Sequence, residues 1–166
     1  NSALVPRYCP TMIYLLGGGW DEGARTSLYG GFAADVLARG GRLAYVLQNG
    51  TSGRRFLDVF AEYGLTCITR VTISAQHPLT PEDLQGGDGL FVAGGVHEHY
   101  QRATQGVANV IRALVLDDGL PYAGFSAGSV VAARAALLGG WLTRHGDGIV
   151  AVCAERRNEG FDLVTV

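Results

Sequence analysis

The sequence predicts an α/β fold in which a mostly parallel sheet is covered by helices on both faces. Short apolar runs alternate with helical patterns along the chain. The runs are almost continuously apolar, which is typical of strands that are buried on both faces of a parallel sheet. The 166 residues contain no internal repeat or linker, so they suit a single domain over residues 11–166.

The first half of the chain predicts three strands and two helices. Residues 11–19 (TMIYLLGGG) indicate a buried strand that ends in glycine, and further strands are expected over 42–50 and 66–73. A helix over 26–41 would place on its inner face Phe32, Val36 and Leu37. A second helix over 53–65 would bury Phe56, Leu57, Phe60 and Ala61.

The second half continues the alternation. Residues 80–87 indicate a short helix, with Thr80 as its N-cap and Pro81 in its first turn. The other expected elements are strands over 89–95 and 121–125, a helix in the second half of 96–119, a helix over 127–138 and two strands within 148–166. Residues 1–10 resemble a protease-site linker, so we interpret them as a linker or a disordered N-terminus outside the domain.

Composition excludes several functions. The net charge is −2 and the arginines are scattered, so we expect no nucleic-acid partner. No apolar run approaches the roughly 20 residues of a membrane span, so we expect no membrane partner. Three distant cysteines, Cys9, Cys67 and Cys153, favour a reducing compartment over a disulfide framework, and we expect a cytoplasmic protein.

Residues Gly124 to Gly128 (GFSAG) match the pattern G-x-S-x-G, with a predicted strand before and a predicted helix after. A sharp turn at this place strains the serine backbone and needs small flanking residues. It exposes the hydroxyl of Ser126 at the carboxyl end of the sheet. The N–H of Ala127, at the start of the new helix, could then stabilise an oxyanion. The alternative is a glycine-flanked serine that only caps a helix.

A second glycine pair, Gly94-Gly95, ends the predicted strand over 89–95. Strand ends gather at one edge of a parallel sheet, where ligands bind. If this strand neighbours the strand of Ser126, Gly95 could offer a second oxyanion N–H. An ordinary strand-to-helix turn explains the pair equally well.

Three segments together resemble the peptidase E and cyanophycinase family of serine peptidases: IYLLGGG, GLFVAGG and GLPYAGFSAGSVVAA. The resemblance extends from about residue 12 to residue 166. It implies a three-layer α/β/α sandwich related to class I glutamine amidotransferases, and a serine–histidine mechanism of acyl transfer. It further implies small substrates, Asp-X dipeptides or β-aspartyl links, with no metal and no cofactor.

Carried over by position, the resemblance makes Ser126 the nucleophile, gives the oxyanion N–H groups to Gly95 and Ala127, and places residues 17–19 at the site edge. Val96 and His97 stand where the family often has a polar substrate-binding residue. The family's catalytic histidine follows a further strand beyond the nucleophile helix. We therefore expect that histidine to lie past residue 166, and the C-terminal part of the family domain to be missing.

The histidines within the chain are weaker candidates for the base that a serine nucleophile needs. His145, with Asp147 nearby, could replace the missing base, although a solvated loop histidine is the simpler interpretation. His97 could reach the site from the strand end as a base or a substrate contact. His97, Glu98 and His99 do not form H-E-x-x-H, because Gln101 occupies the second ligand position. His77, before a proline, suits a turn.

Two functions therefore remain open at this point: a serine peptidase-like hydrolase, and a non-catalytic family member that binds a small ligand or a partner. Recognition of an aspartyl side chain would need an arginine, and the candidates are Arg25, Arg54, Arg102 and Arg134. A glutaminase-type amidotransferase is disfavoured, because no cysteine lies near the turn. An open sheet edge near the tail would favour a homodimer.

Overall fold

The computed structural model describes residues 11–137, 141–145, 148–152 and 157–164. Its centre is a sheet of five parallel strands in the order β1-β5-β4-β2-β3. The bounds of these strands are Ile13–Leu16 (β1), Arg42–Gln48 (β2), Cys67–Ile73 (β3), Gly89–Val92 (β4) and Tyr122–Phe125 (β5). The predicted α/β class with a parallel sheet is thus confirmed.

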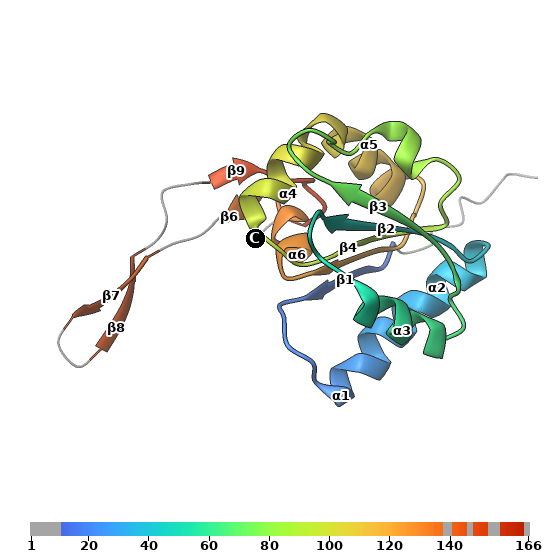
Figure 1. The fold of residues 1–166 in the computed structure, drawn as a ribbon, viewed down its shortest axis with the longest axis horizontal. Helices are drawn as coiled ribbons and strands as arrows, with labels where there is room; N and C mark the ends of the chain where they lie inside the picture. The colour runs from blue at the N-terminus through green and yellow to red at the C-terminus, as the bar shows by residue number, and fades with distance from the viewer. Residues whose placement is uncertain (1–10, 138–140, 146–147, 153–156, 165–166) are drawn as a thin grey trace, which may run out of the picture.

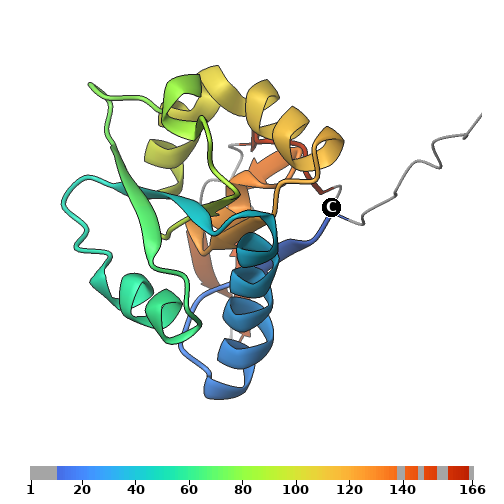
Figure 2. The same cartoon turned by 90° about the vertical axis from the view of Figure 1, so that its right-hand side faces the viewer.

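Helices cover both faces of this sheet (Figures 1 and 2). One face packs against the π-helical turn η1 (Arg25–Gly30), α2 (Gly31–Arg39) and α3 (Arg54–Glu62). The short helix α1 (Glu22–Ala24) precedes η1 and buries no residue. The other face packs against α4 (His97–Thr104), η3 (Gln105–Val107), α5 (Ala108–Arg112), η4 (Ala113–Asp117) and α6 (Ala127–Val131). A 3₁₀ turn, η2 (Pro81–Leu84), precedes β4. The arrangement is the expected three-layer sandwich.

Strand β2 shows why its residues suit the middle of the sheet. Leu43, Tyr45 and Leu47 enter the core beneath α2 and α3. Ala44 and Val46 enter the core on the face of α4 to α6. Because both sets are buried, the strand is apolar at successive positions rather than at alternate ones.

Most elements before β5 agree with the sequence-based prediction, with three corrections. Leu37 is 43% exposed, because the inward stripe of α2 runs through Phe32, Ala33 and Val36 instead. Ala61 is exposed on α3, where Val59 takes the inward position. Helix α4 begins at His97, so the first half of 96–119 is helical too. Thr80 caps η2 as predicted, in a reciprocal capping box with Asp83.

The prediction of a helix over 127–138 is wrong beyond Val131. The chain leaves the helix after α6 and enters β6 (Ala135–Leu137), which pairs with β9 (Arg157–Glu159). Backbone N–H groups of the C-terminal segment bind the freed carbonyls: that of Phe161 donates to Val131 at 2.7 Å, and that of Leu163 to Ala132 at 2.9 Å. Phe161 and Leu163 are buried in the core there. Tertiary pairing has overridden the helix propensity of an alanine-rich segment.

The two strands predicted within residues 148–166 are present, as β8 (Gly148–Val152) and β9. A further strand, β7 (Trp141–His145), precedes this range and forms an antiparallel hairpin with β8. Figure 1 shows this hairpin away from the five-stranded sheet. Across the described ranges, no helix has both the length and the apolar character needed to cross a membrane.

Candidate active site

The carboxyl ends of all five strands meet along one edge of the sheet, where α/β proteins bind their ligands. Ser126 directly follows β5, which lies between β1 and β4. The register pairs Phe125 with Leu16 and Gly124 with Val92. The serine is therefore flanked by the ends of two neighbouring strands, each of which continues into glycines.

Ser126 has a strained backbone, with φ of 52° and ψ of −109°. A positive φ is unusual for a residue with a side chain, and such residues cluster at functional sites. The surrounding hydrogen bonds hold this conformation. The N–H of Ser126 donates to Leu16 O at 2.7 Å, and its carbonyl accepts from the N–H groups of Ser129 and Val130. The strand–turn–helix geometry that G-x-S-x-G predicts is present, with the side chain half-buried.

Both flanking glycines are required by close backbone approach. A Cβ atom on Gly124 would stand 2.5 Å from the carbonyl carbon of Gly128 and 2.6 Å from the nitrogen of Ser129. A Cβ atom on Gly128 would overlap the carbonyl oxygen of Val92. The start of α6 thus lies directly against β4 and β5, and any side chain at these two positions would push the turn open.

Two further hydroxyl groups support the turn. The Ser129 hydroxyl lies 2.6 Å from Gly124 O and 2.8 Å from Leu16 O, and it accepts from the Leu16 N–H at 3.0 Å. The buried Tyr122 hydroxyl donates to Gly128 O at 2.6 Å. These contacts join β1, β5 and α6 around Ser126, and the sequence analysis identified neither of them.

Ala127 is the first residue of α6 and is fully buried. The N–H groups in the first turn of a helix have no partner within that helix, so this N–H suits an oxyanion. Because α6 is only five residues long, the predicted oxyanion role depends on this single N–H and not on a helix dipole.

The turn after β4 lies against the serine. A Cβ atom on Gly94 would stand 3.2 Å from Ser126 Cβ, whereas one on Gly95 would meet Gln48 and Tyr100. Gln48 and Tyr100 were missed by the sequence analysis. A usable signal was the polar residue at the carboxyl end of a buried parallel strand, where Gln48 stands.

The glycines at residues 17–19 leave open space above the end of β1, since a Cβ on any of them would meet nothing within 4 Å. Trp20 follows them and packs on Phe125, with ring centroids 5.8 Å apart. The guanidinium carbon of Arg55 lies 3.6 Å from the centre of the Trp20 ring. The packed side chains of Phe125, Trp20 and Arg55 therefore lie beside the end of β5, next to Ser126.

The histidines are distributed over different elements. His97 is half-buried at the start of α4, three residues after Gly94, while His99 is exposed on the same helix. His77 is in a turn, as expected, and its ring lies 3.4 Å from the Ser74 hydroxyl. His145 is the last residue of β7, which pairs with β8. Asp147, its expected partner, lies outside the described residues.

The four candidate arginines differ in their partners. Arg25 pairs with Glu22 and Glu62, and Arg134 pairs with Asp162. Arg102 pairs with Glu98 at 2.6 Å, and the side chain of Arg102 remains 70% exposed. Arg102 also lines, with His99 and Gln48, a pocket of about 300 Å³ at the carboxyl ends of β2 and β3. Arg54 is exposed at the start of α3.

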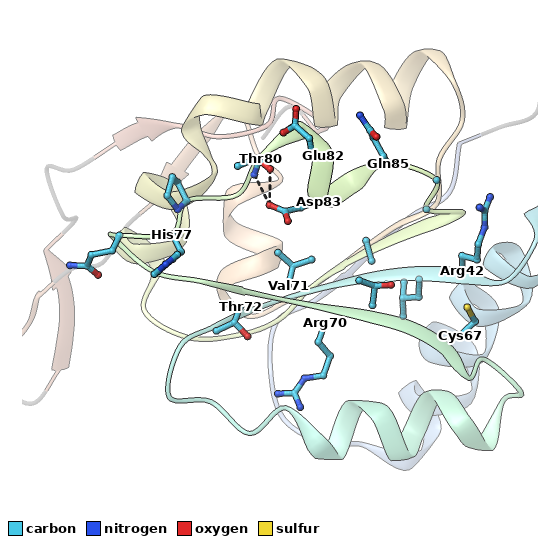
Figure 3. A pocket seen from close by; sticks show the side chains of 17 residues that line it. Arg42, Cys67, Arg70, Val71, Thr72, His77, Thr80, Glu82, Asp83 and Gln85 are labelled. Atoms are coloured by element: carbon cyan, nitrogen blue, oxygen red, sulfur yellow. Dashed lines mark hydrogen bonds between the residues drawn. The ribbon is translucent and has the colours of Figure 1, made fainter.

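A larger groove of about 840 Å³ lies along the edge strand β3, away from Ser126 (Figure 3). Figure 3 shows Val71 facing the segment of Thr80 and Asp83, while Arg70 points to the other side of the strand. None of the lining residues belongs to the turn of Ser126. Within the described ranges, no three His, Cys, Asp or Glu side chains gather in a way that could hold a metal ion.

A strained serine between two closely packed glycines, at the carboxyl edge of a parallel α/β sheet, has the strand–turn–helix geometry that G-x-S-x-G predicts. The sequence signature of peptidase family S51 matches residues 48–138, which is more than half of the chain. The chain therefore belongs to peptidase family S51, a family of peptide hydrolases. The matched segment contains Gly95, His97, Ser126 and Ala127.

Comparison with solved structures finds a candidate peptidase E protein from Listeria monocytogenes EGD-e, with 13% sequence identity and a TM-score of 0.48. The similarity covers 74% of this chain and 62% of that protein, so this chain spans less than two thirds of its length. No curated protein sequence matches the chain.

Proposed function

We propose that this chain is a serine peptidase-type hydrolase in which Ser126 is the nucleophile. The observation that carries the proposal is the strained Ser126 backbone, held between Gly124 and Gly128 at the carboxyl edge of the sheet. The Ser126 hydroxyl attacks a peptide carbonyl, the C–N bond breaks, and the amine leaves with the proton of the hydroxyl. Water then hydrolyses the acyl-enzyme, which releases the carboxylic acid and restores the Ser126 hydroxyl. The N–H groups of Ala127 and Gly95 stabilise the oxyanion of each tetrahedral intermediate.

His97 is our proposed contact for the proton of Ser126 or for the substrate. It begins α4 immediately after the turn whose Gly94 abuts Ser126. His145 is a second candidate, at the end of a strand in a separate two-stranded sheet. Replacing each histidine by glutamine separates the two candidates. Only replacement of the histidine that acts as the base should lower the rate of Ser126 modification at neutral pH.

The proposed substrates are small aspartyl peptides, either Asp-X dipeptides or β-aspartyl links. Arg102, which pairs with Glu98 but remains 70% exposed beside the pocket at the ends of β2 and β3, is our candidate to receive a carboxylate. An Asp-X dipeptide should therefore be cleaved faster than the matched Asn-X dipeptide. Equal rates would contradict the assignment of an acidic substrate. We place this activity in the cytoplasm, with no cofactor and no nucleic-acid partner.

The test uses a fluorophosphonate probe and intact-mass measurement. Wild-type protein should gain one adduct, Ser126→Ala none, and the exposed control Ser27→Ala one. An adduct retained in Ser126→Ala would refute the assignment of the nucleophile. Absence of both labelling and dipeptide cleavage in the wild type would instead favour a non-catalytic protein that binds a ligand or partner.

We also propose a homodimer through the β1 edge of the sheet. Among the described strands, β1 is at the edge of the five-stranded sheet, and Met12 before it and Leu15 within it are 48% and 38% exposed. Exposed apolar edges favour strand pairing. Sedimentation should show a dimer that Leu15→Lys dissociates, and a concentration-independent monomer would contradict this proposal.

A further inference from the structure

A short hydrogen-bond network formed by Tyr100 and Gln48 holds the turn after β4, residues 94–96. The Tyr100 hydroxyl, fully buried in α4, accepts from the backbone N–H of Gln48 at 2.9 Å and donates to Gly94 O at 3.1 Å. The side-chain oxygen of Gln48 accepts from the N–H of Val96 at 2.9 Å. Two side chains from different elements therefore bind both ends of the segment from Gly94 to Val96.

These bonds determine the direction of the Gly95 N–H. A trans peptide is planar, and its C=O and N–H point in opposite directions. None of the described peptide bonds is cis. Because Tyr100 holds the carbonyl of Gly94, the Gly95 N–H of the same peptide unit must point away from Tyr100. Gln48 fixes the following peptide unit in the same way.

The restraint is needed at this position because two consecutive glycines have wide conformational freedom. Without the network, the plane of the Gly94–Gly95 peptide could flip, so that its carbonyl oxygen would point where its N–H had pointed. A carbonyl oxygen facing a developing oxyanion would repel it. The turn is also the direct neighbour of the nucleophile, since a Cβ on Gly94 would lie 3.2 Å from Ser126 Cβ.

We propose that Tyr100 and Gln48 are positioning residues that hold the Gly95 N–H in the orientation required for oxyanion stabilisation at Ser126. The inference rests on the proposed function of Ser126. Neither side chain touches the reacting atoms, and both act through the Gly94–Gly95 peptide. Burial raises the pKa of Tyr100 to about 12, so its hydroxyl stays a donor at neutral pH.

The experiment compares Tyr100→Phe with a matched control, Tyr45→Phe. Tyr45 is also fully buried and its hydroxyl also donates to a backbone carbonyl, that of Gly53, at 3.1 Å. Tyr45 belongs to the core on the opposite face of the sheet from Tyr100. Tyr45→Phe loses one buried hydrogen bond and Tyr100→Phe loses two, so Tyr100→Phe should lose more stability. The two variants are therefore compared by the labelling rate of the folded protein. Only Tyr100 is connected to the oxyanion turn.

The readout is the kinetics of Ser126 phosphonylation at increasing fluorophosphonate concentration. Loss of one oxyanion donor lowers rates by about 10²–10³, so a donor that is only misplaced should cost about 10–100-fold. We expect Tyr100→Phe to lower the limiting rate by that factor, with the half-saturating concentration within about twofold of wild type. Tyr45→Phe should match wild type in both constants.

A second pair of variants covers the case in which Tyr100→Phe does not fold. Gln48→Met keeps the side-chain length but cannot accept from Val96, and it should also slow phosphonylation. Gln48→Glu restores an acceptor and should recover part of the rate. Equal limiting rates in wild type, Tyr100→Phe and Gln48→Met, or an equal loss in Tyr100→Phe and Tyr45→Phe, would overturn the inference. A wild type that is not labelled would instead remove the proposed function, and the inference with it.

Discussion

At the scale of single residues, the backbone of Ser126 is strained, and contacts with neighbouring residues hold it in that conformation. A side chain held at φ of 52° and ψ of −109° costs about 1–3 kcal/mol. The Leu16 carbonyl, the Ser129 hydroxyl and the close packing of Gly124 and Gly128 hold the turn in place. Strain of this kind persists only where the surrounding structure determines the conformation, as it does here.

This strain predicts an unusual order of stability at position 126. Ser126→Gly should be more stable than Ser126→Ala by about 1 kcal/mol, because glycine adopts a positive φ without a Cβ clash. The control is Ser27, in the helical turn η1, where alanine should be more stable than glycine by about 0.5–1 kcal/mol. Urea denaturation of the four variants measures both differences. The same order at both positions would show that Ser126 is not strained in solution.

The sequence was sufficient to predict this turn because its requirements are local. Five consecutive residues specify the two glycines, the serine and the change from strand to helix. The support from Gln48 and Tyr100 could not be predicted in this way. These residues lie 52 positions apart, and their contact depends on β2 and α4 meeting in the folded sheet.

At the scale of elements, the strands were easier to predict than the helix faces. Buried parallel strands require apolar residues at nearly every position, so their pattern depends little on neighbours. Helix faces depend on the direction of packing, and for that reason the expected burial of Leu37 and Ala61 was wrong. Helix α6 shows the strongest effect. Its alanine-rich continuation becomes β6, which pairs with β9. The N–H groups of Phe161 and Leu163 bind the carbonyls at the end of α6, and both side chains are buried in the core.

At the scale of the whole molecule, two hydrophobic cores on opposite faces of one sheet pack against the strands that lead to the carboxyl edge. The proposed catalytic groups Ser126, Ala127 and Gly95 lie at that edge, where β5 and β4 turn into the helices that follow them. At the opposite edge, where the strands begin, charged groups connect the elements. Asp88, before β4, binds Arg42 at the start of β2 through both carboxylate oxygens, at 2.9 Å and 3.2 Å.

The pair of Asp88 and Arg42 predicts how the stability of the whole molecule depends on pH. Hydrogen bonds from Arg42 hold the pKa of the Asp88 carboxyl below its usual value, partly opposed by burial. The unfolded chain therefore binds a proton at higher pH than the folded chain does. The contribution of Asp88 is complete above the ordinary aspartate pKa of about 3.9, and it is lost as the pH falls through the lower value of the folded protein.

The measurement is urea denaturation of wild type and Asp88→Asn between about pH 3 and pH 7, where the ordinary aspartate pKa of about 3.9 lies inside the range. At pH 7, Asp88→Asn should lower the free energy of unfolding by about 1 kcal/mol, the net value of one hydrogen bond. The difference in the free energy of unfolding between wild type and Asp88→Asn should shrink as the pH falls below about 4. The reason is that protonation makes the Asp88 carboxyl of the wild type neutral, as the asparagine side chain already is. Asp58→Asn, at an exposed position on α3, is the control and should follow wild type throughout. A constant difference between Asp88→Asn and wild type at every pH would show that shape, and not the charge of Asp88, holds β2 and β4 together at this edge.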